Sequence, residues 1–104
     1  MNILFICNQN KHRSKTAEFL FKDKFNTKSA GLFNDNPVSE KQAEWADRII
    51  VMEEFQRDEM IKRFPNIYFK KQIISLNIPD AYQYNQPELI DLLKIKIKDQ
   101  FSHS

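Results

Sequence analysis

The chain is poor in the residues that build disulfides, metal clusters and nucleotide-binding loops. Its 104 residues include one cysteine, one glycine and two histidines. A single cysteine excludes an internal disulfide and a thiolate cluster within one chain, and two histidines are too few for an ordinary metal site. One glycine cannot supply the several that Gly-rich dinucleotide or triphosphate loops need. We therefore expect chemistry without a metal or a cofactor.

Strong charge of one sign and long apolar runs are also lacking. Sixteen Lys and Arg against fourteen Asp and Glu give a formal net charge of +2, which is not the basic balance of a dedicated nucleic-acid binder. No run of about 18 apolar residues and no signal-like N-terminus is present, so we expect a cytoplasmic protein without a membrane partner. The length and the 41% apolar content fit a single domain, residues 1–104, with a substantial core.

The most informative segment runs from Cys7 to Ser14, directly after the apolar stretch Ile3 to Ile6. If a central strand ends at Cys7 and a helix begins near Ser14, the loop between them wraps its backbone N–H groups around the sulfur and can bind an anion. The helix N-terminus and nearby basic residues favour the nucleophilic thiolate, and the planar Arg13 fork can bind two phosphate oxygens. This spacing predicts covalent phosphoryl transfer. The alternative is that Cys7 is only a buried apolar residue at a strand end.

Beyond this segment, strand and helix patterns alternate along the chain. The alternation predicts an α/β fold, a three-layer sandwich with a four-stranded parallel sheet and helices on both faces. For this sheet we expect the flavodoxin-like order 2-1-3-4. We expect strands over 2–7, 27–30, 49–52 and 72–76, helices over 14–25, 39–46, 54–64 and from Pro87 onward, and loops over 31–38 and 77–82.

Several helix ends carry recognisable signals. Ser39 and Gln42 fit a capping box, and Pro65 should stop the helix before it. Asn85 and Glu88 are placed to cap the last helix. One apolar face of that helix is expected to consist of Leu89, Leu93, Ile97 and Phe101.

Ligands of parallel sheets bind at the carboxyl edge of the strands, where Cys7, Gly31, Glu53 and Asp80 are expected to meet. Asp80 is the candidate general acid. A leaving oxygen needs a proton, and a phosphate bound nearby favours the protonated carboxyl. The alternative is an ordinary surface aspartate in a turn after proline.

With these segments placed, the chain resembles the low-molecular-weight protein tyrosine phosphatase family. The residues that carry the resemblance are Cys7 to Ser14, Ser29 to Gly31, Asp47 to Met52 and Asp80, in the same order as in the family. The resemblance covers nearly the whole chain and is closest to a shorter bacterial branch known as "predicted protein tyrosine phosphatases". It implies the fold expected above and hydrolysis of a phosphomonoester.

The resemblance also implies a role for each matched residue. Cys7 would take up the phosphoryl group, Arg13 would bind the phosphate, and Asp80 would act first as acid and then as base. Asn10 would hold the loop in shape through its side chain, and Ser14 would hydrogen-bond the thiolate. The other loop residues, expected to bind the phosphate with Asn10 and Ser14, are Asn8, Gln9, Lys11 and His12.

Three aromatic residues are candidates for a substrate wall, namely Phe33, Tyr82 and Tyr84. They would suit stacking on a phenyl ester or on a nucleobase. Alternatively, Phe33 belongs to the core and the tyrosines brace the last helix. The loops 31–39 and 76–80 are shorter than in typical family members, which implies a shallower cleft.

Four readings of the function remain at this point. The first is a phosphatase of phosphotyrosine proteins or small phosphomonoesters, and the second keeps the chemistry but acts on a nucleotide or RNA phosphomonoester. The third is a phosphate-binding module without catalysis. Arsenate reduction ranks lowest, because it usually passes electrons through further cysteines. Nucleic acid is thus expected only as a substrate, and the sequence does not determine the oligomeric state.

Overall fold

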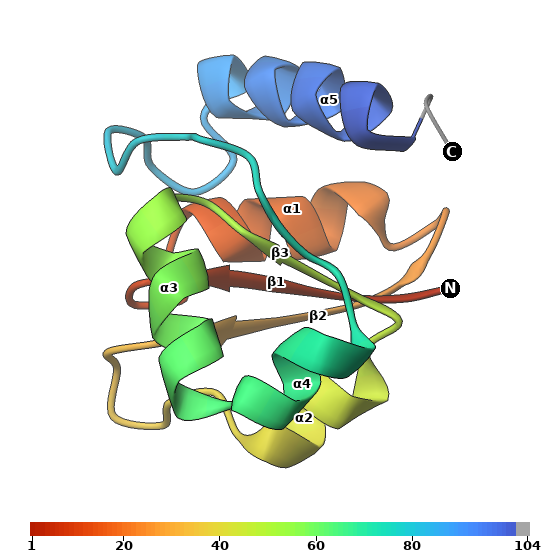
Figure 1. Cartoon of the computed structure of the whole chain (residues 1–104). Coiled ribbons are helices and arrows are strands. Elements are labelled where there is room, and N and C mark those ends of the chain that lie inside the picture. The colour runs from red at the N-terminus through yellow and green to blue at the C-terminus, as the bar shows by residue number, and fades with distance from the viewer. Residues whose placement is uncertain (102–104) are drawn as a thin grey trace.

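The computed structural model describes residues 1–101 and consists of one parallel sheet between two layers of helices (Figure 1). Its four strands lie in the order β2-β1-β3-β4, which confirms the expected sheet. Cys7 pairs with Gly31 at the carboxyl end of the sheet, and Ile6 pairs with Val51. The strands are β1 Asn2–Cys7, β2 Asn26–Gly31, β3 Arg48–Val51 and β4 Ile73–Ser75.

The helices divide between the two faces of the sheet, as expected for this fold. Figure 1 shows α1 (Arg13–Phe21) and α5 (Pro87–Phe101) together on one face. The other face carries α2 (Glu40–Trp45), α3 (Glu54–Arg63) and α4 (Pro65–Lys70). Among residues 1–101, no helix is both long and apolar enough to cross a membrane.

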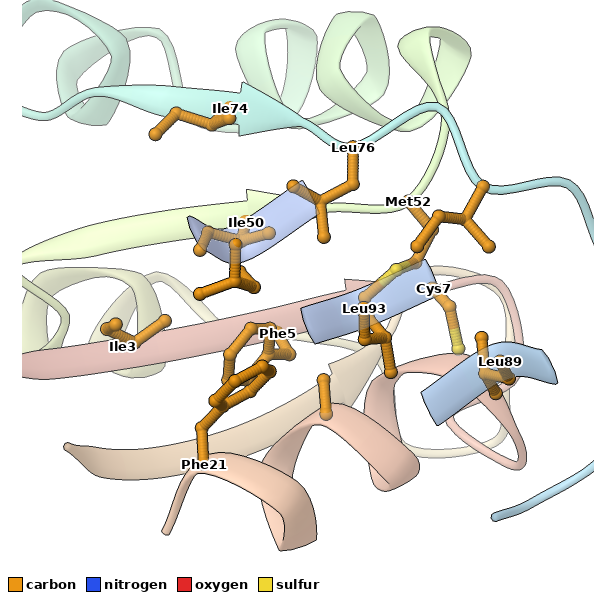
Figure 2. Close-up of a cluster of buried hydrophobic side chains, with 13 residues drawn as sticks. Ile3, Phe5, Cys7, Phe21, Ile50, Met52, Ile74, Leu76, Leu89 and Leu93 are labelled. Atoms are coloured by element: carbon orange, nitrogen blue, oxygen red, sulfur yellow. The ribbon is translucent and has the colours of Figure 1, made fainter. Parts of the chain in front are cut away.

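Alternate residues of β1 supply two separate cores, because successive side chains of a strand point to opposite faces. Ile3, Phe5 and Cys7 belong to the cluster under α1 and α5, which Figure 2 shows, whereas Leu4 and Ile6 belong to the cluster under the other helices. The expected face of α5 is confirmed, with three residues buried and Phe101 partly buried against the first cluster. These four residues are Leu89, Leu93, Ile97 and Phe101.

The end of α1 differs from the sequence-based expectation, and helix α4 was not expected. Helix α1 ends at Phe21 and not at 25, and a turn follows it, in which the N–H groups of Lys24 and Phe25 both donate to the Phe21 carbonyl. Pro65 does stop α3, but it also begins α4, where its missing N–H costs nothing in the first turn.

The start of α5 at Pro87 was predicted correctly, whereas its N-cap residue is not the expected one. The Ile90 N–H donates to the Gln86 carbonyl, so Gln86 and not Asn85 occupies the N-cap position. Hydrogen bonds from its own backbone N–H and from the Gln86 amide hold the pKa of the Glu88 carboxyl below its usual value. The capping box of α2 is confirmed, since Ser39 and Gln42 exchange both hydrogen bonds.

Candidate active site

A pocket of about 220 Å³ lies at the carboxyl end of β1, between the loop 8–12 and the start of α1. The loop 8–12, named the nucleophile loop after the role predicted for Cys7, and the loop after β4 meet there, although they are about seventy residues apart in the chain. The pocket therefore brings together the three residues that the sequence assigns to catalysis. The residues that line it are Cys7, Asn8, Gln9, Lys11, His12, Arg13 and Asp80.

The sulfur of Cys7 belongs to a short chain of hydrogen-bonding groups. Cys7 is 3% exposed, and its Sγ lies 3.0 Å from the hydroxyl oxygen of Ser14. The Ser14 hydroxyl lies 2.6 Å from Asn10 Oδ1, to which it donates. One hydroxyl proton cannot serve both acceptors, so a Cys7 thiol donates to Ser14, whereas a Cys7 thiolate would accept the hydrogen bond from Ser14 in place of Asn10. Asn10 has a φ of 56°, a left-handed conformation that asparagine tolerates well.

Arg13 is held from behind, which leaves part of its guanidinium to face a ligand. The side chain is 2% exposed, and Nη1 donates to Glu53 Oε2 at 2.8 Å and to the Ile78 carbonyl at 2.7 Å. Because Nη1 carries two protons, these contacts leave Nε and Nη2 for two oxygens of an anion. Nη2 lies 3.8 Å from Asp80 Oδ1, which is beyond hydrogen-bond distance.

A fully buried glutamine connects the nucleophile loop to the end of β3. Gln56 Oε1 accepts hydrogen bonds from the N–H groups of Met52 and Glu53, at 2.8 and 2.9 Å, and Nε2 donates to Asn8 Oδ1 at 2.9 Å. The sequence reading placed Glu53 at this edge without a role and did not identify Gln56. The Glu53-x-x-Gln56 capping pattern at the start of α3 was the available signal.

The loop after Cys7 is fixed through its carbonyls. The Asn8 carbonyl accepts from the N–H groups of Leu32 and Phe33. By contrast, none of the backbone N–H groups of residues 8–12 donates a hydrogen bond to another described residue. A β-carbon on Gly31 would come within 2.9 Å of the Asn8 carbonyl oxygen, so this position needs glycine for close approach. The loop thus keeps several donors for an anion.

The aromatic wall candidates are not among the described residues that line this pocket. Phe33 is half-exposed beneath the guanidinium of Arg63, 5.2 Å from its ring centre. Tyr82 is partly buried against the core under α5, which agrees with the alternative that the tyrosines support the last helix. Tyr84 is half-exposed, and its backbone N–H reaches His12. Their role as a substrate wall stays a prediction.

The ion pair between Arg13 and Glu53 yields a stability prediction. We expect Glu53→Gln, which keeps the shape and the cap of α3, to lower the free energy of unfolding by about 1 to 2 kcal/mol, because it leaves a buried guanidinium without its counter-charge. Glu59→Gln is the matched control, since Glu59 pairs with the partly exposed Arg63 and should cost less than about 1 kcal/mol. Urea unfolding at neutral pH measures both, and equal losses would contradict the prediction.

No protein-family model and no curated protein matches the chain. Solved structures do match it. The YwlE arginine phosphatase from Geobacillus stearothermophilus is 20% identical, with a TM-score of 0.72, and the match covers 97% of this chain and 94% of that one. A tyrosine phosphatase from Erwinia amylovora, AmsI, is 19% identical, with a TM-score of 0.78 and coverage of 98% and 91%.

The low molecular weight protein tyrosine phosphatase from T. tengcongensis is 20% identical, with a TM-score of 0.75, and the match covers 97% of this chain and 99% of that one. At such identities the likeness concerns the fold. It extends over nearly the whole chain and confirms the architecture that the sequence predicted. The chain therefore has the fold of the low molecular weight protein tyrosine phosphatases.

Proposed function

We propose that this protein is a cysteine-dependent phosphomonoester hydrolase that works through a phosphocysteine intermediate. One observation carries the proposal. A single pocket contains a buried sulfur, a guanidinium with two nitrogens left to bind an anion, and a carboxyl group. These groups belong to Cys7, Arg13 and Asp80. The unpaired N–H groups of the loop, in the part of the chain described, add donors for the charge on a phosphate.

The reaction divides into two steps. In the first, the Cys7 thiolate attacks phosphorus, so that an S–P bond forms while the P–O bond to the leaving group breaks, and Asp80 protonates the leaving oxygen. In the second, water attacks phosphorus, so that a P–O bond forms while the S–P bond breaks and the Cys7 thiolate leaves; Asp80 accepts the proton of the water, and inorganic phosphate is released. Arg13 binds the equatorial phosphate oxygens through Nε and Nη2 in both steps.

The remaining loop residues divide into two groups. Asn8, Gln9, Lys11 and His12 line the pocket, and we assign them to the surroundings of the phosphate. Asn10 and Ser14 act from behind the sulfur through the hydrogen bonds described above. The family resemblance already implied these roles for Asn10 and Ser14, which the sequence analysis also counted among the six phosphate-binding residues.

The proteins that share the fold do not all act on the same substrate. One of them is an arginine phosphatase and another is a tyrosine phosphatase. Retention of the nucleophile together with an acid candidate favours catalysis over simple phosphate capture. We also propose a cytoplasmic location, because a thiol nucleophile must stay reduced.

A substrate panel tests the proposal. We expect the purified protein to hydrolyse an aryl phosphate and to release inorganic phosphate from one class among phosphotyrosine peptides, phosphoarginine peptides, mononucleotides and RNA with terminal phosphates. The readout is kcat/KM for each substrate. Phosphate binding without turnover of any of these compounds would contradict the proposal and favour a binding module. Thiol-dependent turnover of arsenate alone would favour the reductase.

A further inference from the structure

The loop that carries Asp80 is attached to the start of α1 at two neighbouring points. The backbone N–H of Tyr84 donates to His12 Nδ1 at 3.1 Å, and that of Asn85 donates to Thr16 Oγ1 at 2.9 Å. The Thr16 hydroxyl in turn donates to the His12 carbonyl at 2.7 Å. Two consecutive backbone N–H groups of this loop therefore donate to side chains at the end of the nucleophile loop and in the first turn of α1.

Asp80 itself has little to hold it. Its side chain is 62% exposed, and the ionic contact found for it among the described residues is the 3.8 Å approach to Arg13. A tight turn surrounds it, since the Ala81 N–H donates to the Pro79 carbonyl at 2.9 Å. The position of this carboxyl relative to the sulfur must therefore come from the anchors of the loop on either side.

One anchor precedes Asp80 and the other follows it. On the preceding side, the Ile78 carbonyl accepts from Arg13, and the Ile78 N–H donates to the Met52 carbonyl at 2.7 Å. On the following side, hydrogen bonds connect the backbone to His12 of the nucleophile loop and to Thr16 of α1. Removal of the second anchor would take away the hydrogen bonds between this segment and α1, and would leave the packing of Tyr82 against the core and the hydrogen bonds between Gln83 and Gln86.

We propose that His12 and Thr16 are positioning residues that set the place of the general acid by holding the backbone of Tyr84 and Asn85. The inference rests on the proposed function and adds to it. Nδ1 of His12 acts as an acceptor, so the neutral ring carries its proton on Nε2. Thr16 is fully buried, and its hydroxyl both donates and accepts, so valine cannot replace it.

A general acid that is poorly positioned lowers kcat more for some substrates than for others. Alkyl phosphates have poor leaving groups and need a proton from Asp80, whereas nitrophenyl phosphate has a good leaving group and depends on the acid far less. We expect His12→Ala and Thr16→Val to lower kcat on an alkyl phosphate by roughly 10- to 100-fold, since displacement by about 1 Å costs that much. On nitrophenyl phosphate the loss should be several times smaller.

Conservative variants separate the hydrogen bond from other roles of the same residues. In His12→Asn the amide oxygen lies near the original Nδ1 and should restore the rate on the alkyl ester, whereas His12→Gln should not. Thr16→Ser should likewise keep its activity. Thr27→Val is the matched control, because it removes a hydroxyl that donates to α1 at the Glu18 carbonyl, away from the acid loop.

A double-mutant cycle completes the test. With Asp80→Ala already present, His12→Ala should change kcat on either ester by less than about twofold, because the group that it positions is gone. An equal loss on both esters, or a full additional loss in the Asp80→Ala background, would overturn the inference and leave the proposed function intact. A wild-type protein inactive on both esters would overturn both.

Discussion

Cys7→Ser is expected to abolish phosphatase turnover, with a fall in kcat of at least about 10⁴-fold. The serine hydroxyl is not ionised near neutral pH, and the hydrogen-bond partner found at this position, the hydroxyl of Ser14, is not a base that could remove its proton. The measurement is steady-state release of inorganic phosphate from an aryl phosphate. Full activity in Cys7→Ser would exclude the phosphocysteine mechanism.

The loss in Cys7→Ser should occur in a folded protein that still binds phosphate. Serine is close to cysteine in size, and at position 7 it keeps a polar neighbour in Ser14. The substitution leaves unchanged the other side chains of β1 in the same core cluster, Ile3 and Phe5 (Figure 2). Inorganic phosphate should therefore raise the unfolding temperature of Cys7→Ser much as it does for the wild type, because Arg13 and the loop donors are unchanged.

Asp80→Ala is expected to lower kcat by roughly 10²- to 10⁴-fold on a substrate whose leaving oxygen needs a proton. The Michaelis constant should not rise, because the substitution removes a negative charge from the mouth of an anion site and leaves Arg13 in place. Stability should change little, since the side chain is largely exposed.

The control for Asp80 is Asp35→Ala. Asp35 is an exposed aspartate in the loop after β2, and its loss should leave kcat unchanged. Asp80→Asn should resemble Asp80→Ala, since the amide keeps the shape but is not a usable acid. Equal activities of the wild type and Asp80→Ala on an alkyl ester would mean that another group supplies the proton.

Much of the fold was predictable, because its determinants lie close together in the chain. Alternation of strand and helix patterns predicted a four-stranded parallel sheet between helices, and the spacing of Cys7 and Arg13 indicated a loop between a strand and a helix. The cap of α2 follows from two residues three positions apart, Ser39 and Gln42. Two details were missed although they too are local, namely α4 directly after Pro65 and the N-cap of α5, which is Gln86 and not Asn85.

The candidate site shows the same division. By itself, the sequence determined the nucleophile loop, its arginine and the edge of the sheet at which they lie. The tertiary structure alone decided that Glu53 and Gln56 hold this loop from behind and that His12 reaches the acid loop. These pairs are separated by 40, 48 and 72 residues, so no spacing or periodicity reports them. Their distances arise only when the packed cores bring α1, α3 and the loop before α5 together at one end of the sheet.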